Sequence, residues 1–240
     1  MCDRIASTRE HVPPLCLFPE SKDVFGENFR KDLITVPSCE EHNSKKTKDD
    51  EFLMVTIAGI SGNNYLGYHH TMTKINRAIT RKSMDFLRKV ILQNSKEKIV
   101  QLASGKKYSV LHGTPDFKRL IGCFNHIAYG LYFHEYRTAF KGQISITLGF
   151  INYNDPNSNI FVKFLRRRFE LEELVLEEKG KNPDVFTYQF CKPDQIGIIA
   201  LKLNFYSKTD VFIAYQPEGV STPYNIGLDL MNQGLSLIHI

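Results

Sequence analysis

The residues best suited to chemistry in this chain lie near its N-terminus. Glu10 and His11 are adjacent in the stretch TREHVPP, and Cys39, His42 and Asn43 stand close together in SCEEHN. Hydrolysis of a phosphodiester bond needs a base to activate water and a Lewis acid to neutralise the phosphoryl charge. A neutral imidazole suits the base, and a carboxylate with an Asn carbonyl suits Mg²⁺, which prefers oxygen ligands. His11, Glu10 and Asn43 are residues of those types.

Ligands of a softer kind lie beside this set. Cys39 and His42 are separated by two residues, which is the spacing of two ligands of a tetrahedral zinc ion, and Cys2 is a candidate third ligand. A fourth ligand is missing, because the first cysteine of a Cys-x-x-Cys pair ending at Cys2 would precede Met1. We therefore expect that the chain begins slightly too late. Three lysines follow Asn43 and are candidate phosphate contacts, namely Lys45, Lys46 and Lys48.

The stretch TREHVPP…LFPE…DLITVPSCEEHNSKKTKDDEF resembles the HNH endonucleases, the ββα-metal group, over roughly residues 2 to 53. It is similar in particular to bacterial members with a Cys-x-x-Cys before the Glu-His pair and another immediately before the Asn. The resemblance implies a small ββα-metal module over residues 1–55, in which His11 is the general base. It also implies that Glu10 and Asn43 hold a catalytic Mg²⁺ or Mn²⁺.

The same resemblance implies roles for further residues. Asp32, where the family usually has Asn, would complete the catalytic set with Asn43 by holding the histidine loop through backbone hydrogen bonds. A structural zinc would be bound by Cys2, Cys39 and His42, where His42 replaces a Cys and the first cysteine of the family is absent. A site with three protein ligands would bind zinc more weakly, and a small module depends on its metal for folding.

Beyond residue 55 the pattern changes to longer helices and strands. Residues 74–93 have apolar positions at helical spacing, and residues 118–136 form a second predicted helix. From about residue 142, short runs rich in β-branched and aromatic residues predict antiparallel strands. We therefore expect an α+β fold, in which the small N-terminal module is followed by a larger region of helices and antiparallel strands over residues 56–240.

Positive charge gathers in one part of the chain. The net charge is +5, and residues 74–120 hold twelve Lys or Arg against three Asp or Glu. Along the helix predicted over residues 74–93, four cations fall on one face, namely Lys74, Arg77, Arg81 and Arg88. This basic ridge is a candidate for contacts with the phosphates of nucleic acid, which would make binding salt-dependent. An ordinary solvated helix face is the alternative.

Composition narrows the cellular setting. No apolar run reaches the roughly 18 residues needed to span a bilayer, and the N-terminus lacks the apolar core of a secretory signal. Five cysteines, an odd number at scattered positions, fit reduced thiols better than a disulfide framework. We expect a cytoplasmic protein with no membrane partner. The apolar end, SLIHI, is expected not to be native.

Together these features predict a metal-dependent endonuclease that hydrolyses nucleic acid, with DNA as the first choice and a structural zinc separate from the catalytic ion. Two alternatives stay open. A non-catalytic module stabilised by zinc could bind nucleic acid or a protein, and a nuclease of this kind could act on RNA, because the chemistry of the site does not separate the two substrates. Replacing His11 with Ala distinguishes a nuclease from a binding module.

Overall fold

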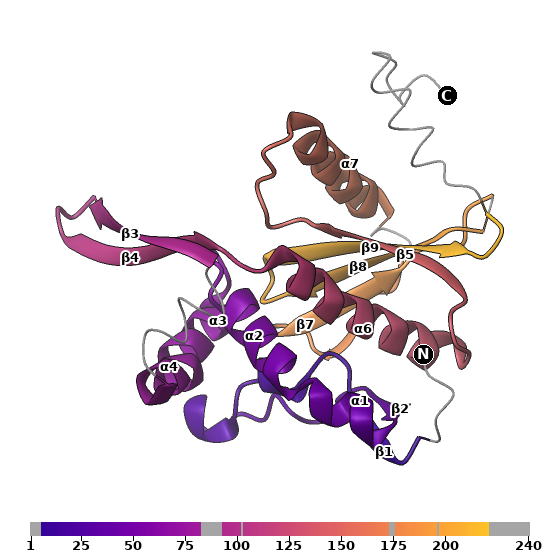
Figure 1. Ribbon diagram of the computed structural model, residues 1–240, viewed down its shortest axis with the longest axis horizontal. Helices are drawn as coiled ribbons and strands as arrows, with labels where there is room; N and C mark the ends of the chain where they lie inside the picture. Colours follow the sequence, from indigo (N-terminus) through magenta and orange to yellow (C-terminus); the bar gives the residue numbers. More distant parts are fainter. Residues whose placement is uncertain (1–5, 83–92, 102, 173–175, 196, 221–240) are drawn as a thin grey trace.

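The structure, a computed structural model, describes residues 6–82, 93–101, 103–172, 176–195 and 197–220 (Figure 1). The expectation of an α+β fold is confirmed, because helices and antiparallel sheets both build the molecule. Within these residues, no helix is long and apolar enough to cross a membrane.

The largest sheet lies in the C-terminal half of the chain, and all of its strand pairs are antiparallel. In strand β8 every second side chain is buried, including Leu201, Leu203 and Phe205, which is the pattern of a strand with one face on a core. The strands expected from about residue 142 are thus confirmed. The strand order is β5-β9-β8-β7-β6, with bounds Gly142–Leu148 for β5, Lys179–Asn182 for β6, Phe186–Phe190 for β7, Ile199–Phe205 for β8 and Thr209–Pro217 for β9.

Two helices cover opposite faces of this sheet (Figure 1). Helix α6, Phe117–Tyr136, agrees with the helix expected over residues 118–136, and its buried side chains belong to the main hydrophobic cluster with β8. Helix α7, Pro156–Glu172, covers the other face, where Phe169 packs against Phe212 of β9 with ring centroids 5.6 Å apart. The neighbours of Phe212 in β9 face the α6 side, as the alternation of a strand requires.

The N-terminal half consists of short elements. Helix α2 joins this half to the sheet, because Phe52 and Ile57 are fully buried in the same cluster as α6 and β8. The elements are β1 (Thr8–His11), the 3-10 turns η1 (Leu15–Leu17) and η2 (Ser21–Asp23), β2 (Thr35–Ser38), α1 (Glu40–Lys45), α2 (Thr47–Ala58), α3 (Tyr65–His70), the π-helical turn η3 (Thr71–Ile75) and α4 (Asn76–Lys82). Helix α1 contacts β1, and helix α6 contacts β2 (Figure 1).

The segment between the two halves differs from expectation. Of the helix expected over residues 74–93, the structure describes η3 and α4, which continue from α3 and end at Lys82, while residues 83–92 lie outside the described part. An antiparallel pair that the sequence did not predict then follows, with β3 at Gln93–Gln101 and β4 at Lys107–Thr114. We call this pair the ribbon.

Candidate functional site

The residues expected to do chemistry lie on a hairpin and the helix that follows it. Strands β1 and β2 pair in antiparallel register, with Glu10 opposite Val36 and His11 opposite Thr35. The pairing continues one residue further, where the Val12 amide donates to the Ile34 carbonyl at 2.9 Å. Glu10 and His11 therefore stand at the end of a strand whose position is fixed by backbone hydrogen bonds.

Helix α1 begins directly after β2 and lies against β1. Cys39 is its N-terminal cap residue and is buried, and Asn43 lies one turn further along. The Asn43 side-chain amide donates to Thr8 Oγ1 at 3.3 Å, and the Thr8 hydroxyl donates to the Ser38 carbonyl at 2.9 Å. These two hydrogen bonds tie α1 to both strands, and they leave the Asn43 carbonyl oxygen as the group of this side chain that could bind a cation.

Glu10 shares the α1 side of the hairpin with Thr8, because alternate side chains of a strand point to the same face. Its carboxylate accepts a charge-assisted hydrogen bond from the Lys46 ammonium. Lys46 is only 8% exposed, so it departs from the expected role of a phosphate contact. Its charge is instead used inside the protein, where burial of the Glu10 carboxylate requires a cation.

A second carboxylate belongs to this charged cluster. Burial raises the pKa of Asp50 to about 6, with the Lys46 charge opposing the rise and the Glu10 and Asp49 charges adding to it. The cluster of Glu10, Asp50 and Lys46 thus has two acids for one buried ammonium. Such a set favours the entry of further positive charge.

His11 lies on the other face of the hairpin, together with Arg9 and Thr35. On that face the Arg9 guanidinium donates to Thr35 Oγ1 at 2.8 and 3.0 Å. Partial burial, and then the charge of Arg30, lower the pKa of His11, so its imidazole is neutral near pH 7. The structure therefore places Glu10 and Asn43 on the same side of the hairpin and sets His11 one residue along, on the opposite face of the strand end.

Asp32 does not hold the histidine loop as expected. Its backbone is left-handed, with φ of 53°, and within the described residues its carboxylate makes no hydrogen bond to that loop. The hydrogen bond between Val12 and Ile34 secures the loop instead. Asp32 lines a cavity of about 650 Å³ that borders the hairpin face of Arg9 and Thr35.

The far wall of this cavity comes from the C-terminal half, from the end of α6 and from β6. Glu135 of α6 accepts hydrogen bonds from Lys179 at 2.6 Å and from the Tyr188 hydroxyl at 2.8 Å. These contacts lower the pKa of Glu135 against the opposing effect of its burial. The cavity is thus lined by charges of both signs, and the hairpin is its other wall.

The expected structural zinc site is largely outside the described part of the chain. Cys2 and the side chain of His42 are not described, and Cys39 alone of the expected ligands is placed. Among the described side chains, no group of three or more His, Cys, Asp or Glu could hold a metal ion. Structural zinc bound by Cys2, Cys39 and His42 therefore stays a prediction from the sequence.

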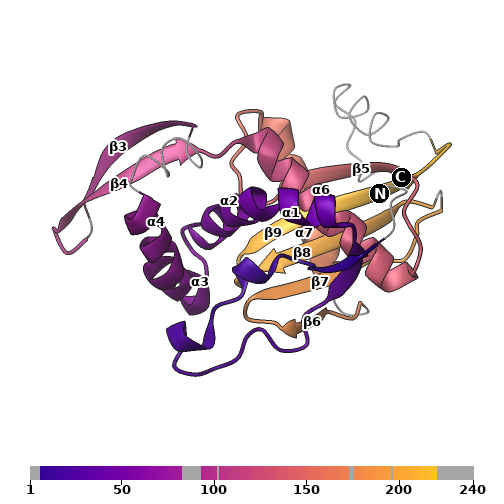
Figure 2. The ribbon, with the colours of Figure 1, turned by 60° about the horizontal axis from the view of Figure 1, so that its bottom comes forward.

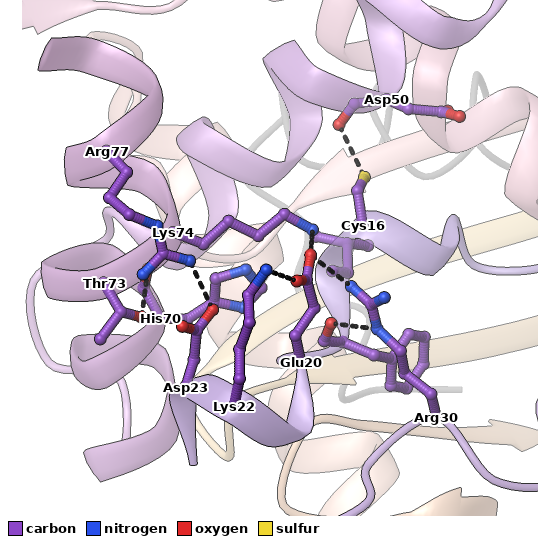
Figure 3. Close-up of polar contacts among 12 residues, drawn as sticks. Cys16, Glu20, Lys22, Asp23, Arg30, Asp50, His70, Thr73, Lys74 and Arg77 are labelled. Carbon is purple, nitrogen blue, oxygen red and sulfur yellow. Dashed lines mark hydrogen bonds and ion pairs between the residues drawn. The ribbon is translucent and has the colours of Figure 1, made fainter. Parts of the chain in front are cut away.

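Two cations of the expected basic ridge contact acids of the N-terminal segment (Figure 3). Lys74 Nζ lies 3.3 Å from the Glu20 carboxylate, and Arg77 Nη2 lies 2.7 Å from that of Asp23. Both side chains hold η3 and α4 against that segment, which differs from a ridge directed at phosphates. The side chain of Arg81 and all of Arg88 lie outside the described residues.

Lys45 and Lys48 are the two remaining lysines that the sequence suggests as phosphate contacts. Lys48 is exposed at the start of α2 and stays available to solvent, while the side chain of Lys45 is not described. Arg119 of α6 secures this end of α2, because its guanidinium donates to the Lys48 carbonyl and to the Asp49 carboxylate, each at 2.7 Å.

Arg9 and Arg30 are cations near His11 that the sequence did not single out. Arg30 Nε donates to the Phe18 carbonyl at 3.0 Å, and its Nη2 lies 3.4 Å from Glu20. Arg9 makes no ion pair with any described acid. The resemblance assigns no role to Arg9 or Arg30, so only their folded positions identify them. Comparison with family models, curated proteins and solved structures finds no match for the chain.

Proposed function

We propose that this chain is a cytoplasmic, metal-dependent nuclease that hydrolyses phosphodiester bonds of DNA, with His11 as the general base. The observation that carries the proposal is the position of α1 on β1, where Asn43 lies 3.3 Å from Thr8 on the strand face that also bears Glu10. This arrangement puts two oxygen ligands beside the strand end that carries a neutral imidazole.

The Glu10 and Asn43 oxygens fit a cation, because the Glu10 carboxylate already binds the Lys46 ammonium. A divalent ion held there would supply a Lewis acid for the phosphoryl and leaving oxygens. Such an ion must either displace Lys46 from the Glu10 carboxylate or share that carboxylate with it. The second acid, Asp50, compensates the added charge. We therefore expect metal binding to be of moderate strength and sensitive to Lys46.

The proton transfer in this reaction is carried out by His11, on its face of the hairpin. The imidazole takes a proton from water, whose oxygen attacks phosphorus, while the bond from phosphorus to the leaving oxygen breaks and solvent protonates that oxygen. The lowered pKa of His11 keeps it unprotonated and ready for this step near pH 7. Arg9, which is exposed on the same face and has no acidic partner among the described residues, is available to bind a phosphate of the substrate backbone.

The proposal is tested by cleavage of supercoiled plasmid with Mg²⁺ or Mn²⁺. The wild type should cut, EDTA should stop it, and an excess of the divalent ion should restore it. His11→Ala should lose about 10²- to 10⁴-fold in rate while binding DNA normally. His134→Ala, a matched change of a half-buried histidine in α6, should cut like the wild type.

The same assay separates the other functions. Equal or faster cleavage of single-stranded RNA would change the substrate to RNA. Binding of DNA without cleavage by the wild type would contradict the nuclease and favour a binding module.

A further inference from the structure

The ribbon of β3 and β4 projects from the body of the molecule, as both views show (Figure 1, Figure 2). Its strands pair from Lys96 opposite His112 to Gln101 opposite Lys107. Among the described elements, β3 and β4 have their extensive contacts only with each other. The β3 side chains that the structure describes, from Lys96 and from Lys98 to Gln101, are all exposed and open to a partner.

The charge of the ribbon is strongly positive. Residues 93–114 contain four lysines and a single acid, Glu97. All four lysines are exposed, and none forms an ion pair with an acidic side chain that the structure describes. Two lie in β3 on one face, because they are two residues apart, one lies in the turn that joins the strands, and one begins β4. They are Lys96, Lys98, Lys106 and Lys107.

We propose that the ribbon is a DNA-binding arm that lies in the major groove of duplex DNA. A two-stranded ribbon is one of the two protein elements that the major groove of B-form DNA, about 12 Å wide, admits. At about 3.4 Å per residue, the nine residues of β3 reach about 30 Å, close to one turn of the duplex. The proposal rests on the proposed function, since it names how that nuclease holds its substrate.

The positions of the four lysines suit contact with duplex DNA. Lysines on one face and at the end of a ribbon can reach phosphates on both sides of a groove, each as a point charge. Val100, which shares the face of Lys96 and Lys98, is 42% exposed and can contact base edges, for which a thymine methyl is an apolar partner. Without a partner, an exposed ribbon bearing Ile99 at 74% exposure would be open to self-association.

The test measures the salt dependence of binding to a fluorescent DNA duplex by anisotropy, in the His11→Ala background so that the duplex stays intact. The ribbon variant carries four Lys→Gln changes, at residues 96, 98, 106 and 107. If each lysine neutralises one phosphate, the slope of log K against log salt should fall by about 3 to 4. Four Lys→Arg changes at the same positions should keep the slope.

A matched control changes four exposed lysines of the body to Gln, at Lys141, Lys163, Lys192 and Lys208. It removes the same charge and should leave the slope close to that of the parent. An equal fall in both variants would mean that net charge, and not the ribbon, drives binding, and it would overturn the proposal.

Duplex RNA of the same sequence tests entry into the groove, because its major groove is too deep and narrow for side chains to read. The four Lys→Gln changes should cost much more affinity on DNA than on RNA. Equal losses on both duplexes would overturn groove entry. Unchanged DNA binding, with self-association lost in Ile99→Ser, would make the ribbon a protein interface instead.

Failure of the arm and failure of the nuclease give different results. A wild type that cuts plasmid, with a ribbon variant that binds like its parent, would contradict the arm and keep the nuclease. A wild type that binds DNA through the ribbon lysines without cutting would keep the arm and contradict the nuclease. No binding to DNA by the wild type would contradict both.

Discussion

In strand β8 of the C-terminal sheet every second side chain is buried, whereas strand β1 of the N-terminal hairpin has no buried residue. The C-terminal sheet is held by apolar side chains that have no other task, and Leu203 and Phe205 are fully buried among them. The hairpin of β1 is held by backbone pairing and by charged contacts such as that of Glu10 with Lys46. Charged groups of this kind can exchange their partners for a metal ion or a phosphate, which apolar groups cannot do.

The comparison predicts its largest effect in the sheet. Phe205→Ala should lower the free energy of unfolding by about 3–5 kcal/mol, because the ring is fully buried between Phe124 and Phe186. The loss should be the same from pH 5 to pH 8 in denaturant unfolding. Phe117→Ala, at an exposed position of α6, should change stability by no more than about 0.5 kcal/mol. A loss below about 1 kcal/mol for Phe205→Ala would break the comparison.

A smaller effect is expected where a charge is left alone in the N-terminal half. Lys46→Met should lower the free energy of unfolding by about 2–3 kcal/mol, because it removes the cation beside the mostly buried Glu10. Urea unfolding near pH 7 measures the loss. The exposed Lys48→Met is the matched control and should be within about 0.5 kcal/mol of the wild type. If both variants lose equally, the Glu10 contact has no special role.

The third effect has the opposite sign and depends on pH. The pKa of Asp50 is about 6 in the folded protein, above the value of an unfolded Asp near 3.9, so the folded state binds its proton more tightly. Stability should therefore fall as pH rises from about 4 to 6, and stay lower above that. Asp50→Asn should gain about 1 kcal/mol at pH 7, a figure kept small by the partial exposure of the carboxylate, and nothing at pH 4. A gain in stability that does not change with pH would contradict the raised pKa of Asp50.

The smallest effect is expected at Glu20. The Lys22 ammonium, 2.6 Å away, is the first cause that lowers the pKa of Glu20 to about 2, and Lys74 and Arg30 also contribute. Glu20→Gln should lose less than about 1 kcal/mol at pH 7, because these ion pairs are partly solvated. The depressed pKa means that the difference from the wild type shrinks as pH falls from about 4.5 towards 2. Thermal unfolding at pH 7 and pH 3 measures it, and a larger difference at pH 3 would be contrary.

The sequence predicted the elements whose burial follows a regular period. Helix α6, expected over residues 118–136, is an example, because its buried residues Leu120, Phe124 and Ile127 recur at helical spacing. The ribbon is not predicted, because the described side chains of β3 are exposed and show no apolar alternation that would indicate a core. Apolar periodicity indicates that an element packs on a core, so an element that packs on no core lacks this pattern.

For the candidate site, the sequence predicts the types of residue present, but it does not predict which side chains contact one another. Strands β1 and β2 are followed along the chain by helix α1, and a metal-binding ββα module at this place stays a prediction. The contact of Glu10 with Lys46 joins residues 36 apart, and that of Lys74 with Glu20 joins η3 to the loop after η1. Tertiary packing decides such pairs, and nothing in the local sequence at Lys46 or Lys74 distinguishes an internal ion pair from a phosphate contact.

The central claim, that Glu10 and its neighbours hold a divalent ion, is tested most directly by Mn²⁺ binding measured with EPR spectroscopy. Lys46 competes with the ion for Glu10, so Lys46→Met should bind Mn²⁺ about tenfold more tightly than the wild type, a change of about 1.4 kcal/mol. Glu10→Gln should bind it at least about tenfold more weakly. Opposite shifts in the two variants would support the site, and equal affinity in all three proteins would contradict it.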